Sequence, residues 1–391
     1  MLMINFENTK FVFSQKSNWE LKKSYYLFSI LRHSFLVKIA SLLLKISFFL
    51  RLPIKKLIKI TIFNQFCGGE NIQDCNIKIN ILSDFGIGTI LDYSVEGKEK
   101  ITDFEKTKEE IIQTILFSAK NNKIPFTVFK ITGLGESSLI KKANSNLDDL
   151  SKNENSELNL VFKRVDQICK TAFENKVSVF IDAEASWYQA YIDSIAELMI
   201  FKYNNESAIV YNTIQLYRHD RLHYMKGLIL RCSSNNKFLG LKLVRGAYME
   251  KERERAIKQN YNDPIHKDKE STDHDFSMAV EYCLKNIDFV SLCLGTHNEK
   301  SVLHLINLMT DYSLRKNDYR IYFAQLLGMS DHISYNLAEQ GYNIAKYVPY
   351  GPIYEVIPYL IRRAEENTSV SGQTGRELSL IRKEIKNRNL V

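Results

Sequence analysis

The chain has 391 residues, 45% of them hydrophobic, which is enough for one large core or for a barrel with a smaller appendage. Its six cysteines form no CxxC pair, so they indicate a reducing compartment and neither a disulfide framework nor a zinc site. The net charge of +8 is uneven, because nine lysines and arginines and no acidic residue lie between Leu21 and Gly69. Taking these nine charges from +8 leaves −1 for all other residues, so the basic character belongs to the N-terminal region.

Residues 1–84 are expected to form this basic helical region. The run FLVKIASLLLKISFFLRLPIKKLIKITIF is apolar between its cations, which recur as on an amphipathic helix, and no window of about 20 residues is free of charge. A transmembrane helix is therefore not expected. Two interpretations stay open: a helical arm that packs on the main domain, and a helix that lies on an anionic membrane. Residues 1–20 contain Glu7 and Glu20 and show neither a secretory nor a transit signal, which favours the inner face of a bacterial membrane over a mitochondrion.

Residues 85–391 alternate short apolar segments with longer helical blocks such as 105–120 and 301–316. The strand candidates are 88–94, 126–131, 178–183, 208–215, 238–245, 289–295, 319–326 and 344–349. This order predicts a (βα)₈ barrel; the alternative is an open doubly wound sheet, which the absence of GxGxxG after the first strand disfavours. The polar segment 144–159 is expected to be a surface excursion.

Polar side chains at the predicted strand ends indicate where chemistry takes place, because a barrel collects its active site there. They are Lys130, Asp182, Glu184, Gln215, Lys242, Arg245, Thr296, His297, Gln325 and Tyr347. Each alone could be a cap or a solvated side chain. Together, with more cations than carboxylates, they favour a site for a phosphate-bearing cofactor and a carboxylate substrate. No nucleophile–base pair is evident, so the set indicates redox chemistry on a bound cofactor.

Two adjacent arginines, Arg362 and Arg363, lie in a predicted helix near the C-terminus. Guanidinium groups bind carboxylates through forked hydrogen bonds, so the pair could hold an anionic substrate. The alternative is an exposed helix with surface ion pairs.

A metal site is the competing hypothesis for the chemistry. His219 and His223 are spaced i,i+4, and Asp220 and His297 could join them in a metal-dependent barrel hydrolase. An HxxxH pair without a companion carboxylate motif is more typical of a polar helix face, so no metal is expected. A third hypothesis is a non-catalytic, membrane-associated scaffold that retains the fold.

Seven motifs in order make the chain similar to the proline dehydrogenase family. They are FNQFCGGE, FIDAEASWYQ, YNTIQLY, LKLVRGAYMEKERERA, GTHNEKSV, FAQLLGMSDHIS and KYVPYGPIYEVIPYLIRRAEENTSVSG, which cover roughly residues 60–375. The resemblance implies a distorted (βα)₈ barrel with a last helix across its mouth, and the layout of the monofunctional enzyme. It also implies FAD as cofactor, L-proline as substrate, Δ¹-pyrroline-5-carboxylate as product and a membrane quinone as electron acceptor. Nothing indicates a nucleic acid partner.

The resemblance also assigns roles to individual residues. Catalytic roles fall to Asp182 and Lys242. The substrate would be held by Lys130, Arg362 and Arg363 at its carboxylate, with Lys130 paired to Asp182, and by Tyr248, Leu326 and Tyr347 around its ring. FAD would be bound by Ala183, Gln215, Arg245, Gly246, Ala247, Thr296 and His297. Hydroxyproline-specific relatives have a smaller residue in place of Tyr347, so we expect proline to be preferred, with hydroxyproline oxidation as the alternative.

Overall fold

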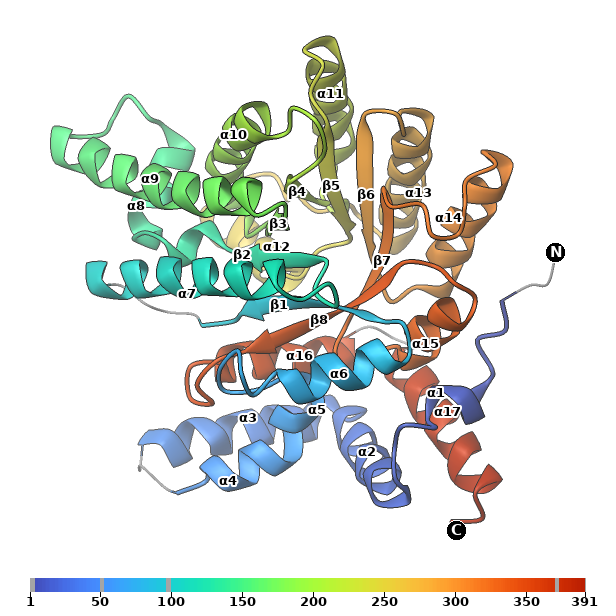
Figure 1. Ribbon diagram of the computed structural model, residues 1–391. Coiled ribbons are helices and arrows are strands. Elements are labelled where there is room, and N and C mark those ends of the chain that lie inside the picture. The colour runs from blue at the N-terminus through green and yellow to red at the C-terminus, as the bar shows by residue number, and fades with distance from the viewer. Residues whose placement is uncertain (1–3, 50–52, 96–99, 370–372, 391) are drawn as a thin grey trace. The chain divides into compact units, whose positions relative to one another are not determined.

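The computed structural model describes residues 4–49, 53–95, 100–369 and 373–390 (Figure 1). Eight strands follow one another around a closed barrel, and the recorded pairings between them are parallel. The strands are β1 (Gly88–Tyr93), β2 (Phe126–Phe129), β3 (Ser178–Ile181), β4 (Val210–Gln215), β5 (Leu239–Val244), β6 (Val290–Gly295), β7 (Ile321–Leu326) and β8 (Ile344–Tyr350). Each lies on a predicted strand segment, so the predicted barrel is confirmed.

Helices precede, separate and follow the strands. Before β1 lie α1 (Thr9–Val12), α2 (Asn18–Leu31), α3 (Ser34–Phe49), α4 (Lys55–Ile58), the π-helix η1 (Lys59–Phe63), α5 (Asn64–Phe66) and α6 (Asn76–Asp84). Between strands lie α7 (Ile101–Ala119), the 3₁₀-helix η2 (Ile131–Gly133), α8 (Ser137–Ser145), α9 (Lys152–Glu174), α10 (Ser186–Tyr203), α11 (Arg221–Ser234), α12 (Met249–Gln259), α13 (Lys269–Lys285), α14 (Glu299–Asp311) and α15 (Asp331–Glu339). After β8 come α16 (Ile357–Ser369) and α17 (Gln373–Asn387).

The expected surface excursion at 144–159 is wrong for its second half, because α9 begins at Lys152. Ser151 caps this helix. Its backbone N–H donates to the Glu154 carboxylate at 2.8 Å, and the Glu154 N–H donates to the Ser151 hydroxyl at 3.3 Å. This reciprocal pair is a capping box, which starts a helix even in a polar sequence. The Ser-x-x-Glu spacing was the signal that the compositional argument overlooked.

The chain divides into two compact units, Met1–Glu96 with Gln325–Val391, and Gly97–Ala324. The boundary predicted after residue 84 stays a prediction. In the second unit, helices surround the strands (Figure 1). Phe126 stacks on Phe180 with ring centroids 4.5 Å apart, and both contact the ring of Tyr211 edge-on. Gly240 makes room for that ring, since a Cβ there would lie 2.4 Å from it.

In the first unit, the N-terminal helices pack on the C-terminal ones: α2 contacts α16 and α17, and α3 contacts α16. Leu21, Phe28 and Val37 of these N-terminal helices are buried, and Phe28 meets the ring of Phe66 edge-on at 6.5 Å. Burying such a side chain stabilises the fold by roughly 1.5–3 kcal/mol. The helical arm therefore packs on protein. Arg51 and the side chain of Lys45, two of the predicted basic positions, lie outside what the structure describes.

Within the described ranges, no single helix is both long and apolar enough to cross a membrane. By length and composition alone, the pair Asn18–Leu31 and Phe35–Leu44, bent by 97°, meets the same criterion together.

Candidate active site

Lys242 and Asp182, the two predicted catalytic residues, form an ion pair. Lys242 lies on β5 opposite Thr213 of β4, and Asp182 directly follows β3, so the lysine side chain spans β4. The ammonium donates to Asp182 Oδ1 and lies 5.3 Å from the centre of the Phe180 ring. The exposed fractions of the two side chains are 7% and 14%. The predicted pairing of Asp182 with Lys130 stays a prediction.

The ends of β2 and β3 are tied together through a buried carboxylate. Glu184 accepts hydrogen bonds from the Thr132 N–H at 3.0 Å and from the Thr132 hydroxyl at 2.5 Å. Thr132 belongs to η2, which directly follows the half-buried Lys130. Ala183, between Asp182 and Glu184, is itself buried. Glu184 therefore fixes the backbone that carries Lys130 on one side and Asp182 on the other.

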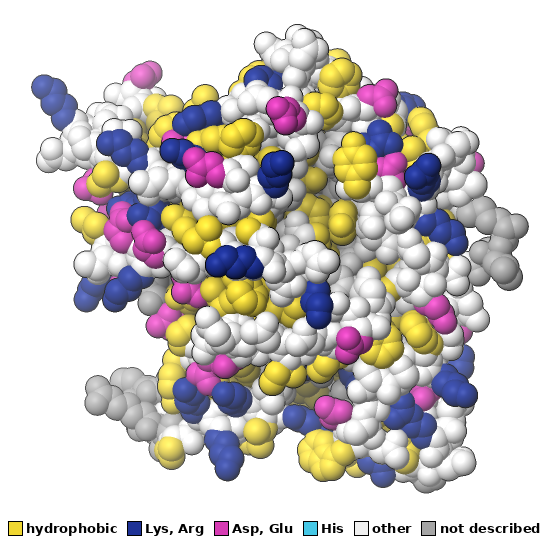
Figure 2. All heavy atoms as spheres, in the orientation of Figure 1, with side chains coloured by type: hydrophobic (Ala, Val, Ile, Leu, Met, Phe, Trp, Pro, Cys, Tyr) yellow, Lys and Arg dark blue, Asp and Glu magenta, His cyan; other side chains and the backbone are white. Residues whose placement is uncertain are grey.

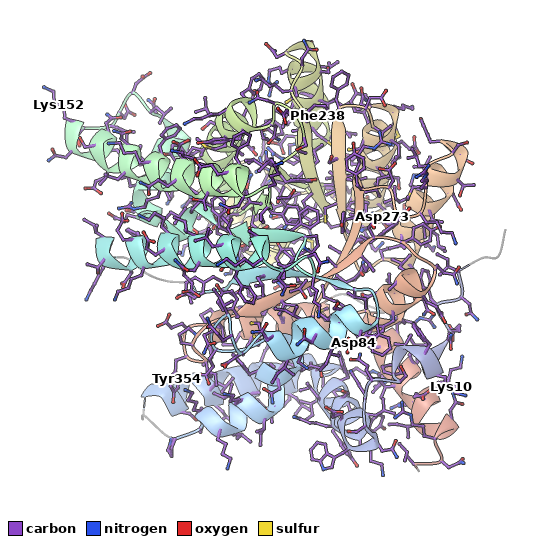
Figure 3. All side chains as sticks on the ribbon, in the orientation of Figure 1. Lys10, Asp84, Lys152, Phe238, Asp273 and Tyr354 are labelled. Carbon is purple, nitrogen blue, oxygen red and sulfur yellow. The ribbon has the colours of Figure 1, made fainter. Side chains whose placement is uncertain are left out.

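Arg245, at the end of β5, is held by side chains from three further elements. It donates to Asp273 of α13, to the Thr296 hydroxyl and to the Ser301 hydroxyl of α14, each at 2.9 Å. Asp273 is labelled in Figure 3. Burial opposes its ionisation, but hydrogen bonds from Lys269 and Arg245 keep the Asp273 pKa below its usual value. The guanidinium is thus fixed by the protein itself, and it joins Arg245 to Thr296, another predicted cofactor residue.

The segment after β4 and β5 has features that fit a large cofactor. Gln215 is buried, and its Oε1 has no hydrogen-bond partner among the described residues, so an acceptor is available for a ligand. Gly246 has φ +143°, and a Cβ there would lie 2.5 Å from the Tyr217 ring. The exposed Gly246 and Ala247 leave the backbone open to close approach. Tyr248 and His297, also predicted site residues, are half-buried.

The other predicted substrate residues belong to the first unit. Leu326 ends β7 and is half-buried, while Tyr347 is buried on β8. Arg362 and Arg363 lie on α16, where Arg362 is half-buried. Arg363 is 8% exposed, with its guanidinium 5.2 Å from the centre of the Tyr359 ring. The pair is therefore not an exposed surface helix face. Its prediction to lie across the barrel mouth stays a prediction.

The first unit contains a further buried charge cluster, which the sequence does not predict. Lys346 of β8 is fully buried, with its ammonium 2.9 Å from Asp331 Oδ1. It also donates to the carbonyls of Met329 at 2.5 Å and Leu326 at 3.3 Å. Burial works against the charge of Asp331, but Lys346 and Lys16 overcome it and hold the Asp331 pKa below its usual value. The cluster holds the loop that follows Leu326.

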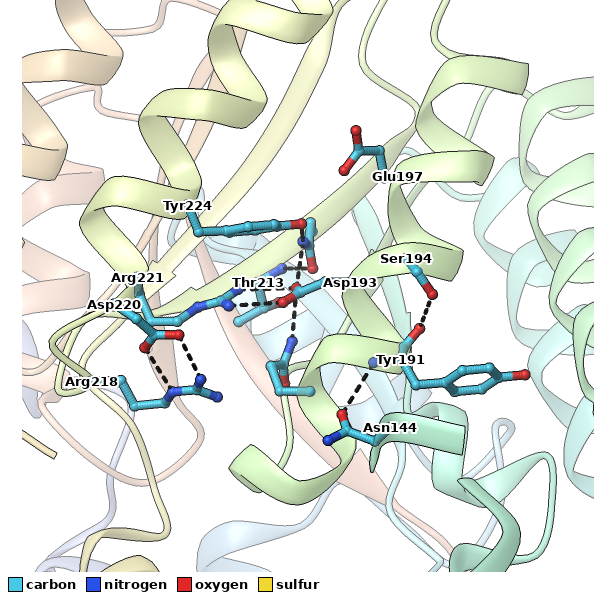
Figure 4. Close-up of polar contacts among 12 residues, drawn as sticks. Asn144, Tyr191, Asp193, Ser194, Glu197, Thr213, Arg218, Asp220, Arg221 and Tyr224 are labelled. Carbon is cyan, nitrogen blue, oxygen red and sulfur yellow. Dashed lines mark hydrogen bonds and ion pairs between the residues drawn. The ribbon is translucent and has the colours of Figure 1, made fainter. Parts of the chain in front are cut away.

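A third buried network lies between α10 and α11 (Figure 4). Arg221 Nη1 is 2.8 Å from Asp193 Oδ2, and Asn212 and Gln189 each donate to Asp193 Oδ1 at 3.0 Å. Gln189 also accepts from the Glu184 N–H at 2.8 Å. The network therefore reaches the end of β3 and supports the backbone beside Asp182. The only signal for this network in the sequence is Asp193, a charged residue on the buried face of α10.

The HxxxH pair leads to no metal centre in the described part of the chain, which contains no group of three or more metal-binding side chains. His219 precedes α11 and its Nε2 lies 3.3 Å from the Asp263 carbonyl oxygen, whereas His223 lies within the helix.

Comparison with known proteins identifies what the barrel resembles. Residues 75–376 match the family model described as proline dehydrogenase. The chain is 33% identical to proline dehydrogenase 1, mitochondrial, of Dictyostelium discoideum, over 86% of this chain and 66% of that protein. It is 31% identical to hydroxyproline dehydrogenase of Xenopus laevis, over 96% of this chain and 89% of that protein. Proline utilization A from Bdellovibrio bacteriovorus has the same fold, with a TM-score of 0.73 and 19% identity over 95% of this chain and 40% of that chain.

Proposed function

The chain belongs to the proline dehydrogenase family, and we propose that it oxidises L-proline to Δ¹-pyrroline-5-carboxylate, with FAD as cofactor and a membrane quinone as electron acceptor. The observation that carries this proposal is the ion pair that Lys242, within β5, makes across β4 with Asp182 at the end of β3. Ionic groups are costly to bury, and this pair keeps a small exposed fraction at the side of the barrel where chemistry collects, which supports a catalytic role.

FAD, when bound, supplies the two-electron oxidant for the carbon–nitrogen bond of the substrate ring. The acceptor of Gln215 and the open backbone at Gly246 and Ala247 support binding beside β4 and β5. Ala183, Thr296 and His297 complete the proposed cofactor set. Arg245 acts here by fixing Thr296 through its hydrogen bond.

The carboxylate of proline is proposed to be bound by Arg362 and Arg363, with Lys130 as a third cation. Forked hydrogen bonds from guanidinium orient a carboxylate as well as attract it. Orientation at a fixed distance removes much of the entropic barrier to a reaction between two bound molecules, by several kcal/mol.

The substrate nitrogen has to be neutral, because its lone pair forms the new carbon–nitrogen double bond as the neighbouring C–H bond breaks. Cations close to an amine disfavour its protonated form, so the arginines and Lys242 lower the pKa of the bound amine. Asp182 holds the Lys242 ammonium in place, where it stabilises negative charge that develops during the reaction. Tyr248, Leu326 and Tyr347 surround the ring and exclude water.

A titration of the purified yellow protein with L-proline under anaerobic conditions tests this proposal. Stoichiometric loss of the visible flavin absorbance, with formation of the cyclic imine product, is expected. A colourless protein that binds metal instead, or a flavin that proline does not reduce, would contradict the proposal and favour a barrel hydrolase or a non-catalytic scaffold.

Oxidation of 4-hydroxyproline is the second candidate function, which the similarity to the Xenopus laevis hydroxyproline dehydrogenase favours. The bulky, buried Tyr347 argues against it, since a phenol beside the ring crowds a hydroxyl group at the 4-position. We expect kcat/KM for proline to exceed that for hydroxyproline, and Tyr347→Ser to reduce the difference. Equal values in the wild type would overturn the preference for proline.

The proposed quinone acceptor is a lipid, so the enzyme is proposed to work as a peripheral protein at the inner face of a bacterial membrane. The basic and apolar character of the N-terminal helices supports this location. Recovery of the native protein from the washed membrane fraction would be expected, and recovery entirely in the soluble fraction would contradict it.

A further inference from the structure

Helix α3 carries a stripe of exposed apolar side chains. Phe35 is 71% exposed, Leu42 58% and Leu43 57%, and Leu36 and Ile39 are also exposed. Their spacing puts all five on one face of the helix. The opposite face buries Val37, and α3 contacts α2 and α16. Single exposed apolar residues are ordinary, but a continuous stripe indicates a binding surface.

Helix α2, which precedes α3, also exposes apolar side chains: Trp19, Tyr26 and Ile30 are 70%, 65% and 49% exposed. The other side of α2 buries Leu21 and Phe28 against protein. A helix that is buried on one side and apolar on the other is suited to lie on a membrane. We name the eight exposed residues of α2 and α3 the apolar stripe.

A cavity of about 360 Å³ lies beside the junction of α2 and α3, between the two parts of the apolar stripe in the sequence. It is lined by Arg32, three positions before Phe35, and by α17, which contributes Arg382, Lys383 and Lys386. No carboxylate is among its lining residues. Lys383 pairs with Glu7 at 3.2 Å, whereas Arg32, Arg382 and Lys386 have no ion pair with any described residue. We name these four side chains the basic pocket.

Figure 2 shows dark-blue and yellow side chains side by side over the helices that Figure 1 labels α2 to α4 and α17. A protein that binds a soluble anion needs the cations and not the apolar side chains. A protein partner with an apolar surface needs the apolar side chains and not an acid-free pocket. A membrane with anionic lipids offers phosphate at the depth of the cations and acyl chains next to it.

We propose that the basic pocket binds the phosphate of an anionic phospholipid headgroup while the apolar stripe enters the acyl region. This deepens the proposed membrane contact and rests on it. The arginines would bind phosphate oxygens through forked hydrogen bonds, and Lys386 would add charge. The protein would then bind individual lipid headgroups through directed hydrogen bonds, in addition to the general attraction between its positive charge and the anionic membrane.

Sedimentation of the full-length flavoprotein with vesicles tests this proposal. The wild type should partition more strongly into vesicles of phosphatidylglycerol and phosphatidylcholine than into phosphatidylcholine alone. Arg382→Ala combined with Lys386→Ala should weaken the partitioning at least about tenfold, since each cation at an anionic surface contributes roughly a fivefold factor. Lys163→Ala combined with Lys170→Ala on α9, which removes equal charge, should have little effect.

A separate double variant tests the apolar stripe. Phe35→Gln combined with Leu42→Gln should weaken binding to both kinds of vesicle and leave the preference for the anionic one unchanged. If the Arg382 and Lys386 double variant partitions like the wild type, the headgroup site is wrong. Inorganic phosphate could stabilise the wild type and not the Arg382 and Lys386 double variant, while both proteins bind vesicles equally. The pocket would then bind free phosphate, and the lipid proposal would be overturned.

Failure of the proposed enzymatic activity is a separate outcome. All variants should oxidise proline with a water-soluble dye acceptor at the wild-type rate, because none of these residues belongs to the candidate active site. A wild type that binds vesicles but does not oxidise proline would contradict the activity and leave the headgroup site supported.

Discussion

Two buried lysines on barrel strands, Lys242 of β5 and Lys346 of β8, are held in different ways. Lys242 pairs with Asp182 at another strand end, and both side chains keep a small exposed fraction, 7% and 14%. Lys346 is fully buried and contacts three acceptors, namely Asp331 and the carbonyls of Leu326 and Met329. An ammonium has three donor hydrogens. Lys346 therefore uses all its donors to fix a loop, which leaves none for a ligand.

A lysine–aspartate ion pair thus has two different roles in this barrel. A sealed pair whose cation also binds backbone carbonyls is part of the scaffold. A pair that borders solvent at the strand ends can act on a substrate. Removing the sealed lysine should therefore cost stability, and removing the bordering lysine should cost activity.

Lys346→Met breaks the sealed cluster and should have the largest effect. It leaves Asp331 and two backbone carbonyls without their buried donor, and loss of one partner of a buried pair costs about 3–5 kcal/mol. Lys16, 3.5 Å from the other Asp331 oxygen, compensates only part of the charge. Urea unfolding would measure the decrease in the free energy of unfolding. Lys285→Met, at an exposed position of α13, is the control, and a decrease equal to the control's would refute the scaffold role.

Lys242→Met should instead reduce kcat/KM for proline at least about a hundredfold, which is about 2.7 kcal/mol of transition-state stabilisation. The loss of unfolding free energy should be smaller than for Lys346→Met, because Asp182 keeps some contact with water. Steady-state kinetics with a dye acceptor gives the first quantity, and Lys242→Arg, which keeps the charge, should recover part of it. If Lys242→Met had the wild-type kcat/KM for proline, the role of Lys242 would be structural.

Arg362→Met and Arg363→Met test whether cations of the first unit, which also contains Lys346, can bind substrate. If the arginines bind the substrate carboxylate, each variant should raise KM for proline about tenfold to a hundredfold, since a hydrogen bond to a charged group contributes about 1.5–3 kcal/mol. Flavin content and unfolding free energy should change little. The exposed Arg382→Met on α17 is the control. Wild-type kcat/KM in either variant would return that arginine to a structural role.

The sequence was sufficient to predict the eight strands because each is a short apolar run, and the strand-end rule then identified Lys242 and Asp182. The pairing between them could not be predicted, because it depends on how a side chain spans the intervening β4. Lys346 was overlooked although it lies beside the predicted Tyr347. A lysine within a strand looks like a solvated position until its buried partners, Asp331 and the loop carbonyls, are known.

Glu377 of α17 adds a small, pH-dependent effect to the sealed cluster. It accepts a hydrogen bond from the Ser330 N–H, and burial is the main cause that raises its pKa above the usual 4.5. Of the charged groups around it, Asp331 raises the Glu377 pKa further, and His332 and Lys346 lower it. The folded state thus holds this proton more tightly than the unfolded state does.

A raised carboxyl pKa in the folded state gives stability that is complete below the unfolded value of 4.5 and is lost as pH rises through the folded value. Glu377→Gln cannot ionise, so its free energy of unfolding should lack this loss and should gain on the wild type as pH increases. Urea unfolding at several pH values would measure the difference. Glu339→Gln, at an exposed position of α15, should follow the wild-type curve. If Glu377→Gln also runs parallel to the wild type, Glu377 titrates alike in both states and burial does not control its charge.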